Sequence, residues 1–327
     1  MSNLDHKGGQ FVISLDFELF WGVWDVATIE GYGANILGVK QVIPSLIEVF
    51  NQYGIKATFA TVGFLFASNK AELEKYNPTQ IPSYENEAYN VYKSELSKIG
   101  NNEEDDGYHF GYSLLQQLKN TSHEISTHTY SHYYCLEEGQ TIDDFKADTK
   151  AAIEIAKKEE IVLQSIVFPR NQINEEYLEM LYNLGIKSYR GNPTSWIYKP
   201  RKFAAEIPFI RLCRLLDTYV PISGNNIHNI CVTKNEPINI PASRFLKPYS
   251  AFLSIFEPLK IRRIKVEMTA AAKQGKLYHL WWHPHNFGLN LQKNLNNLTN
   301  ILNHYKKLNH QYGFSNFTMD EVTRLVK

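Results

Sequence analysis

Short apolar runs alternate with longer segments of helical periodicity along this chain, and this alternation constrains its fold more than any other feature. Runs with the length of a buried strand lie at 11–19, 56–63, 123–129, 165–169, 187–191 and 277–283. Helical spacing of apolar residues marks the intervening segments 36–53, 143–160, 174–185, 260–275 and 291–308. Strands that alternate with helices build βα units around a parallel sheet, so we expect an α/β barrel.

Two stretches interrupt this alternation. Residues 77–107 contain clusters of Pro, Asn, Glu and Asp, and residues 192–260 are irregular and rich in Pro and Asn. We interpret both as large insertions on the barrel. Because a length of 327 residues is normal for one barrel of this kind, we expect a single domain over 1–327.

Charge and cysteine content exclude several classes of protein. Lys plus Arg and Asp plus Glu both number 34, so no overall basic field favours a nucleic acid as partner. The three cysteines form no CxxC motif, and their odd number argues against a disulfide framework. The first residues lack the pattern of a secretory signal, and no apolar run is long enough for a membrane span. We therefore expect a cytoplasmic protein.

Histidines and carboxylates with the spacing of metal ligands follow two of the expected strands. His128 and His132 stand four residues apart in HTYSH, and on one helical turn both rings would share a face that suits a divalent metal. Asp16 and Glu18 end the first apolar run, and residues two apart on a strand point the same way. A carboxylate and two histidines leave positions open for water and substrate.

The chemistry-bearing residues converge on one expected face. The acidic pair, the histidine pair, Arg170 and His283 all follow predicted strands. In a parallel barrel the carboxyl ends of the strands meet at the face where active sites form. The sequence therefore predicts one site built from separate parts of the chain.

Four motifs then stand in a recognisable order, namely SLDFE, HTYSH, FPRNQ and WWHPHNFG. Together they resemble the polysaccharide deacetylases of carbohydrate esterase family 4, which have the NodB-homology fold. The resemblance runs from residue 11 to about 288. It implies an irregular (β/α)7 TIM-like barrel and metal-dependent removal of N-acetyl groups from amino sugars.

The first motif departs from the usual family pattern of two adjacent aspartates, because Phe17 occupies the second place. A branch of the superfamily places the base and the ligand two residues apart. The resemblance then implies that Asp16 is the catalytic base and that Glu18 binds the metal together with His128 and His132. Zinc suits such a set best, and iron, cobalt, nickel or manganese also fit it.

The last motif supplies a proton donor for the leaving amine. His283 ends the final strand and resembles the late catalytic histidine of the family, while His285 is its competitor. We place His283 first and count His285 among the residues that contact substrate.

The resemblance also implies an arginine that orients the catalytic aspartate through a charge-assisted pair. Arg170 in FPRNQ corresponds to the third motif, and Arg190 in SYRGN could take the same role. Trp196 corresponds either to the aromatic wall of the acyl pocket or to a plain core residue. His123 is interpreted as structural.

The substrate follows from the expected location and from one unusual segment. An enzyme inside the cell would meet a nucleotide-linked or lipid-linked amino sugar, in the assembly of a surface polysaccharide such as an O-antigen or capsule. Residues 244–265 interleave aromatic, aliphatic and basic side chains. This segment either contacts an anionic membrane or packs on the barrel with its cations in water.

Two other hypotheses remain open. The branch with the shifted first motif includes hydrolases of cyclic imides and other small amides, so the target could be such a molecule. The altered motif is also compatible with a barrel that has lost catalysis and only binds carbohydrate.

Overall fold

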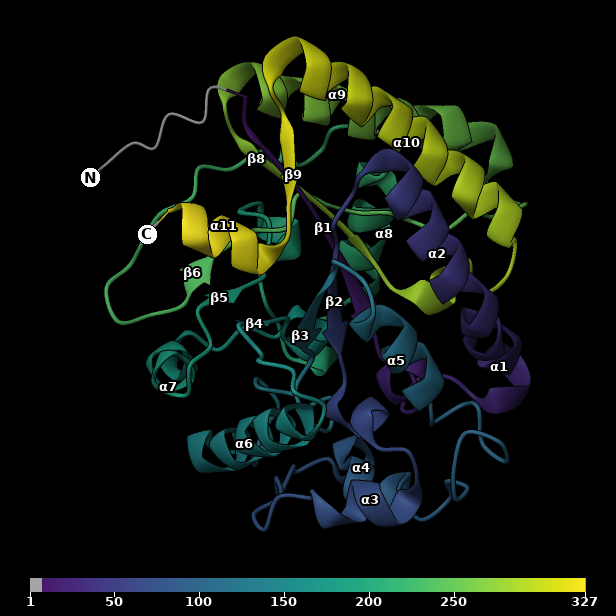
Figure 1. Cartoon of the computed structure of the whole chain (residues 1–327), viewed down its shortest axis with the longest axis vertical. Helices are drawn as coiled ribbons and strands as arrows, with labels where there is room; N and C mark the ends of the chain where they lie inside the picture. Colours follow the sequence, from purple (N-terminus) through teal and green to yellow (C-terminus); the bar gives the residue numbers. More distant parts are fainter. Residues whose placement is uncertain (1–7, 327) are drawn as a thin grey trace.

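The computed structural model describes residues 8–326, and its strands form one sheet in which all pairings between strands are parallel. The central strand β1 (Gln10–Phe17) pairs with β2 (Thr58–Thr61) on one side and with β8 (Leu277–Trp282) on the other. The strand order is β6-β5-β4-β3-β2-β1-β8-β7, and β9 pairs with the start of β1. The chain therefore forms the expected α/β barrel of the (β/α)7 type (Figure 1).

The outer strands are short, and two of them come from a segment expected to be an insertion. Their bounds are β3 (Glu124–Thr127), β4 (Ser165–Ile166), β5 (Ser188–Tyr189), β6 (Ile238–Asn239), β7 (Arg244–Phe245) and β9 (Ser315–Phe317). The stretch 192–260 thus contributes β6 and β7 to the sheet. Within the described residues these two strands end the order and do not pair with each other, so the barrel is open between them.

Helices surround the sheet, with α9 and α10 side by side along its top edge in Figure 1. Their bounds are α1 (Ile29–Leu37), α2 (Val39–Tyr53), α3 (Lys70–Lys75), α4 (Val91–Ser94), α5 (Tyr112–Lys119), α6 (Ile142–Lys158), α7 (Leu178–Asn183), α8 (Pro208–Asp217), α9 (Glu257–Gln274), α10 (Leu291–Tyr312) and α11 (Met319–Leu325). The helix expected over 36–53 is two helices that meet at Gly38. None of the described helices is long and apolar enough to cross a membrane.

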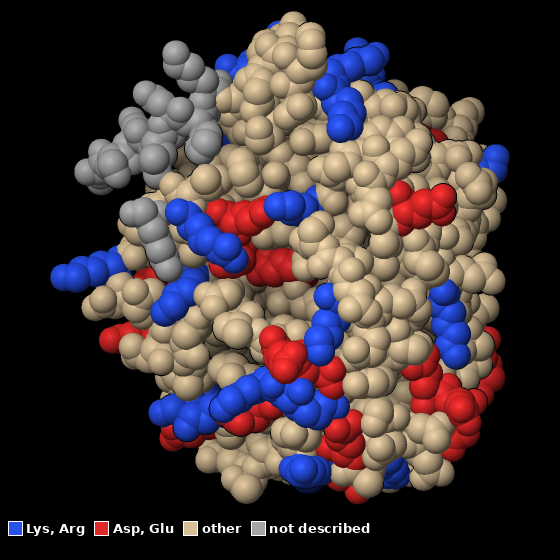
Figure 2. Space-filling view, in the orientation of Figure 1, with Lys and Arg blue, Asp and Glu red and all other residues tan. Residues whose placement is uncertain are grey.

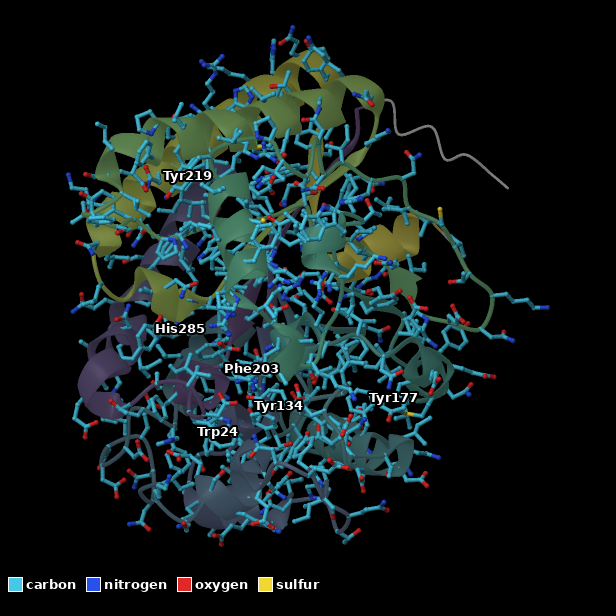
Figure 3. All side chains as sticks on the ribbon, turned by 180° about the vertical axis from the view of Figure 1, so that it is seen from behind. Trp24, Tyr134, Tyr177, Phe203, Tyr219 and His285 are labelled. Atoms are coloured by element: carbon cyan, nitrogen blue, oxygen red, sulfur yellow. The ribbon has the colours of Figure 1, made fainter. Side chains whose placement is uncertain are left out.

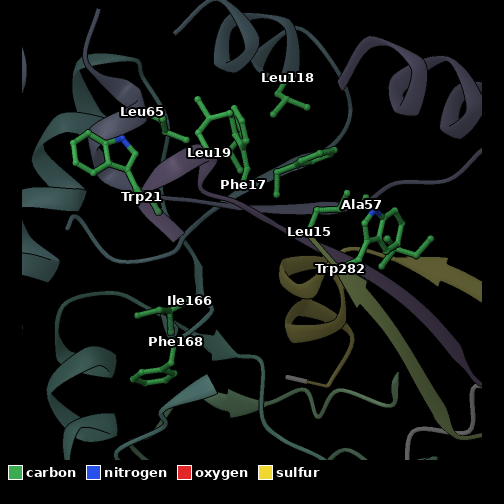
Figure 4. Packing of buried hydrophobic residues seen from close by; sticks show 14 of the residues in the cluster. Leu15, Phe17, Leu19, Trp21, Ala57, Leu65, Leu118, Ile166, Phe168 and Trp282 are labelled. Carbon is green, nitrogen blue, oxygen red and sulfur yellow. The ribbon is translucent and has the colours of Figure 1, made fainter. Parts of the chain in front are cut away.

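The two faces of β1 have different partners, and this difference points the acidic residue inward. Leu15 and Phe17 belong to the large apolar cluster beneath the helices, where Figure 4 shows them near Leu118 and Trp282. Val12 belongs to a smaller cluster that fills the barrel interior. Since side chains alternate along a strand, Asp16 lies on the interior side with Val12.

The first insertion is tied to the segment that follows β1. Buried His109, just beyond residues 77–107, bonds Asp106 at 2.8 Å and Glu95 at 3.2 Å through its two ring nitrogens. Its carbonyl accepts a hydrogen bond from Nε1 of Trp21, which lies in the 3-10 helix Leu19–Gly22. On the surface, acidic and basic side chains are interspersed over the face drawn in Figure 2.

Candidate metal centre and active site

The carboxylate of Glu18 is the centre of the site. Its Oε2 lies 3.1 Å from Nε2 of His128 and 3.3 Å from Nε2 of His132, and the three residues are buried. The ligand atoms that these residues offer all lie within 4.8 Å of one another. The structure therefore brings together the three residues that the sequence predicts as metal ligands.

The hydrogen bonds behind these rings favour a cation between them. Nδ1 of His128 donates to the carbonyl of Val167 at 2.8 Å, which leaves a lone pair on the Nε2 that faces Glu18. Two lone pairs 3.1 Å apart repel each other unless a proton or a metal cation lies between them. Nδ1 of His132 is buried without a hydrogen-bond partner. The donor set therefore fits a divalent metal, and the backbone bond of His128 is the kind of support that orients metal-binding histidines.

The two histidines lie on a loop, so the expectation of one helical turn is wrong. Residues 128–134 follow β3 without helical structure, and Thr129 and His132 have φ values of 64° and 57°. Asp148 of α6 holds this loop, because its carboxylate accepts from the backbone N–H of Tyr130 at 2.7 Å and of Ser131 at 3.1 Å. Two left-handed residues bend the chain back on itself, and this turn aims both rings at Glu18.

Gly22 makes room for the metal-binding carboxylate. A Cβ atom at this position would lie 1.9 Å from Oε1 of Glu18. Any larger residue would therefore displace the Glu18 side chain. The sequence contains this glycine four residues after Glu18, but only the structure shows why it is needed.

Asp16 pairs with Arg190 and not with Arg170. The guanidinium of Arg190 donates to both carboxylate oxygens of Asp16, at 2.6 and 2.8 Å, and both side chains are buried. It also lies 4.1 Å above the ring of Trp281. Of the two arginines considered from the sequence, Arg190 thus has the geometry that orients the aspartate.

Arg170 lies in a different ion pair, so its assignment to Asp16 is wrong. Its guanidinium pairs with Asp25 and lies 4.4 Å from the ring centroids of both Tyr134 and Phe203. Tyr134 and Phe203 are labelled near each other in the view from behind (Figure 3). Arg170 therefore lies in the wall of a cavity next to the metal centre. Both arginines follow strands, so the sequence alone could not separate them.

The two late histidines differ in their surroundings. Nε2 of His283 lies 3.6 Å from Oδ2 of Asp16 and 3.6 Å from Oε1 of Glu18, and its side chain is 23% exposed. His285 is buried, its Nε2 lies 3.0 Å from Oε1 of Glu18, and its Nδ1 lies 2.8 Å from the hydroxyl of Tyr32. Both histidines line the inner cavity, but His283 is the more exposed and lies beside the aspartate, whereas His285 holds the carboxylate of Glu18.

Trp196 does not line the site, contrary to its proposed place in the wall of the acyl pocket. Its side chain is 51% exposed, in the 3-10 helix Trp196–Tyr198. The aromatic residues beside His283 are Trp281 and Phe245, whose ring centroids are 4.8 Å apart. His123 is structural as expected, because its Nδ1 accepts from the backbone N–H of Ala57 at 3.2 Å.

The electrostatics of the site keep both acids ionised. Burial alone would raise the pKa of Glu18, but His283 and the hydrogen bonds with the surrounding histidines lower it well below its ordinary value. Burial likewise opposes ionisation of Asp16, and the charge of Arg190 outweighs it and lowers the pKa of Asp16. Burial lowers the pKa of His132 and His285, which favours their neutral, ligating or hydrogen-bonding forms.

Two connected cavities give access to these residues. The inner cavity, of about 460 Å³, contains Asp16, Glu18, His132 and His283 in its wall. The outer cavity, of about 820 Å³, shares His283 and Arg170 with it. Seven Lys or Arg residues line the outer cavity against one acid, Glu206; they are Arg170, Lys199, Arg201, Arg211, Arg214, Arg244 and Lys247.

Three of these cations have no carboxylate partner. Arg244 pairs with Asp217 and Glu267, and Arg214 pairs with Glu206. Lys199, Arg211 and Lys247 make no ion pair with any residue in 8–326, and burial without an anion lowers the pKa of Lys247. The inner cavity thus offers ligands for a cation, while the outer one offers charges for an anion.

Comparisons with known proteins agree with this geometry. The family model described as polysaccharide deacetylase matches residues 30–189, which include the histidine pair. This match over 160 of the 327 residues supports the polysaccharide deacetylase superfamily for the chain. The match places the chain among hydrolases that act on C–N bonds other than peptide bonds. No curated protein matches the sequence.

Solved structures show the same fold at low sequence identity. A Mycobacterium smegmatis protein classed with the polysaccharide deacetylases has a TM-score of 0.63 at 13% identity, covering 99% of this chain and 92% of that one. A Pseudomonas aeruginosa PAO1 protein classed in the same way has a TM-score of 0.57 at 10% identity, covering 97% and 90%. The PuuE allantoinase has a TM-score of 0.55 at 9% identity, covering 98% and 91%.

Proposed function

We propose that this protein is a metal-dependent hydrolase that removes an N-acyl group, acetyl or formyl, from an amino sugar. One observation carries the proposal: the ligand atoms of Glu18, His128 and His132 converge beside Asp16, which Arg190 holds at the floor of an open cavity. Zinc is the metal we expect, since two imidazoles and one carboxylate suit it.

Each residue has a distinct chemical role in this proposal. A divalent ion held by Glu18, His128 and His132 would polarise the amide carbonyl and make a neighbouring water more acidic. Asp16 accepts the proton of the water as its oxygen attacks the carbonyl carbon. When the C–N bond breaks, His283 donates a proton to the leaving amine. The products are a carboxylic acid and a free amino sugar.

Arg190 makes Asp16 a base of fixed orientation. Its two hydrogen bonds keep the carboxylate ionised and prevent rotation of the side chain. His285 acts in the same way on Glu18, because its ring holds Oε1 while Oε2 faces the histidine pair. Neither residue needs to touch the substrate for this role.

The substrate we propose carries a phosphate, linked to a nucleotide or to a lipid. Trp281, Phe245 and Tyr198 offer aromatic faces on which a sugar ring can stack, and the unpaired cations of the outer cavity suit phosphate oxygens. Removal of the acyl group would leave a free amino group on such a precursor, which fits the assembly of a surface polysaccharide inside the cell. Deletion of the gene should then alter the charge of the surface glycan.

The test is acyl release by the full chain, freed of metal by chelation and then supplied with zinc, cobalt, nickel, manganese or iron(II). Two substrates are nucleoside diphosphate sugars, one with an N-acetyl group and one with an N-formyl group. The others are a prenyl diphosphate-linked N-acetylamino sugar and a neutral chitooligosaccharide. We expect metal-dependent release from a phosphate-bearing sugar and none from the Glu18→Gln variant. Absence of release from every sugar would refute the proposal.

The same assay separates the other two hypotheses. Hydrolysis of a hydantoin or another cyclic imide, with no action on any N-acyl sugar, would show a small-amide hydrolase. Binding of the sugars without turnover, with metal bound, would show a barrel that only binds carbohydrate. Both outcomes contradict the deacylase proposed above.

A further inference from the structure

One exposed face of the molecule is unusually apolar. Helix α8 exposes Phe209, Leu212 and Leu216, whose spacing of three and four residues places them in one stripe. The segment 252–259 exposes more, with Phe252 91% and Ile255 78% accessible. Single exposed apolar residues are common, but a contiguous set of this size on a protein surface marks an interaction site.

The two segments form one surface. Tyr219, just beyond α8, and Phe256, in the 3-10 helix Ser254–Phe256, have ring centroids 5.6 Å apart. Helix α8 lies toward the viewer in Figure 3, where Tyr219 is labelled. We call this surface the apolar rim; it consists of Phe209, Leu212, Leu216, Val220, Phe252, Ile255, Phe256 and Leu259.

The charge around the apolar rim is strongly positive in a chain whose net charge is zero. Residues 199–222 and 244–265 contain eleven Lys or Arg and three Asp or Glu. Of the acids, Asp217 and Glu257 are buried and paired with cations, and Glu206 is paired with Arg214. Among the cations, Arg262 is exposed one helical turn from Leu259 on α9, and Lys199 and Arg211 line the adjoining outer cavity. None of the three has a carboxylate partner among residues 8–326.

Helix α8 also forms a wall of the outer cavity. Its residues Arg211, Arg214 and Leu215 face the cavity, on the side of the helix away from the exposed stripe. A binding partner that contacts the apolar rim would therefore lie beside the mouth of the cavity that leads to His283.

We propose that the apolar rim docks on a lipid membrane that contains anionic phospholipids. Aromatic and aliphatic side chains flanked by cations are the combination that binds the interface of such a bilayer. Docking of this kind needs no spanning helix, and it would present the outer cavity to molecules at the membrane surface. A second copy of this chain would bring the same positive charge to the contact, and like charges disfavour such an interface.

The proposal is tested by co-sedimentation of the full chain with vesicles of phosphatidylcholine, with and without phosphatidylglycerol. We expect binding to the vesicles with phosphatidylglycerol at low salt, and weaker binding as the salt concentration rises. Equal absence of binding to both kinds of vesicle would overturn the proposal. No catalytic turnover is involved, so the result is independent of the proposed deacylation.

Variants locate the contact. The pair Phe252→Ser and Ile255→Ser, and separately the pair Phe209→Ser and Leu212→Ser, should each weaken vesicle binding about tenfold or more. Val162→Ser is the matched control, because Val162 is 73% exposed but lines a separate cavity with Glu124 and Arg324. Arg262→Gln should reduce the dependence on salt. Vesicle binding that all rim variants retain would contradict the proposal.

Sedimentation velocity distinguishes a second copy from a membrane. If the chain is a dimer that the rim variants convert to monomers, and it does not bind vesicles, the apolar rim is a dimer interface and the proposal is wrong. Unchanged thermal unfolding of the variants would show that they fold, as expected for exposed positions.

Discussion

The inner and outer cavities lie side by side, but their charged groups are arranged in opposite ways. In the inner cavity, buried Asp16 and Glu18 are surrounded by Arg190 and four imidazoles, so every acid has a partner. In the outer cavity, Lys199, Arg211 and Lys247 line the wall and have no ion-pair partner within the described residues 8–326. The inner cavity can therefore bind a cation, and the outer cavity can bind an anion.

This difference predicts how each region responds to mutation. Removing one partner of a buried pair leaves an uncompensated charge, which costs about 3–5 kcal/mol. Removing an exposed cation leaves only water in its place, so stability changes little. Substitutions in the inner cavity should therefore affect metal binding or catalysis, and also folding where a buried charge loses its partner, while those in the outer cavity should affect substrate affinity alone.

The largest effect is expected for Glu18→Ala, which removes the carboxylate that both histidines of HTYSH face. Zinc affinity should fall by more than about 100-fold, because even supporting residues of metal sites contribute 10–100-fold. Titration calorimetry of the metal-free chain measures this. Glu138→Ala is the control, since Glu138 is an exposed carboxylate in a pair with Lys202. Equal zinc affinity of the two variants would contradict the metal centre.

Asp16→Asn should come next, with retention of the metal. Loss of the base should lower kcat by about 10²–10⁴-fold, while the zinc content stays at that of the unmodified chain. Steady-state kinetics and metal analysis of the same preparation test both parts. If Asp16→Asn loses the metal and Glu18→Ala keeps it, the division of roles between the two acids is the reverse of the one proposed.

The two arginines offer a smaller and more specific test. Arg190→Lys keeps a charge but cannot donate two parallel hydrogen bonds to Asp16, so kcat should fall about tenfold or more. Arg170→Lys should leave kcat within about threefold, because its partner is Asp25. The pH dependence of kcat should shift only in the Arg190 variant. A larger loss for Arg170 would show that it acts on the reacting groups.

The smallest effect on activity is expected for substitutions of the unpaired cations in the outer cavity. Lys247→Ala or Arg211→Ala should raise KM for a phosphate-bearing sugar by about 5–30-fold, equivalent to about 1–2 kcal/mol for a lost charged hydrogen bond. KM for a neutral chitooligosaccharide should stay constant. Lys93→Ala, which removes a surface pair with Glu87, serves as the control. Equal effects on charged and neutral sugars would show that the cavity does not recognise phosphate.

Elements with an apolar or periodic signal are predictable from the sequence, including the two-residue strands β4 and β5 inside the expected strands 165–169 and 187–191. The apolar runs correctly predict β1, β2, β3 and β8, and helical periodicity predicts α2, α6, α9 and α10. Strands β6 and β7 are as short as β4 and β5, but they lie in the Pro- and Asn-rich stretch 192–260, where no apolar run stands out. They were therefore placed inside an insertion, and the helix α8 between the fifth and sixth strands was missed.

The site shows the same limit at the level of single residues. The sequence singles out Asp16, Glu18, His128, His132 and His283, and the structure brings them together. It does not predict the left-handed backbone at Thr129 and His132, because only a few per cent of residues other than glycine adopt that conformation. The sequence also does not show why position 22 is glycine, because the close approach of Glu18 to this position exists only in the folded chain.

What the sequence determined by itself is the set of reactive groups and the strands that carry them, because spacing and periodicity are local properties of the chain. Only the tertiary structure decided which arginine meets Asp16, which late histidine lies beside Asp16, and where the unpaired cations and the apolar rim lie. These contacts join residues from distant parts of the chain, and their energies depend on burial and direction. Neither quantity exists until the barrel has formed.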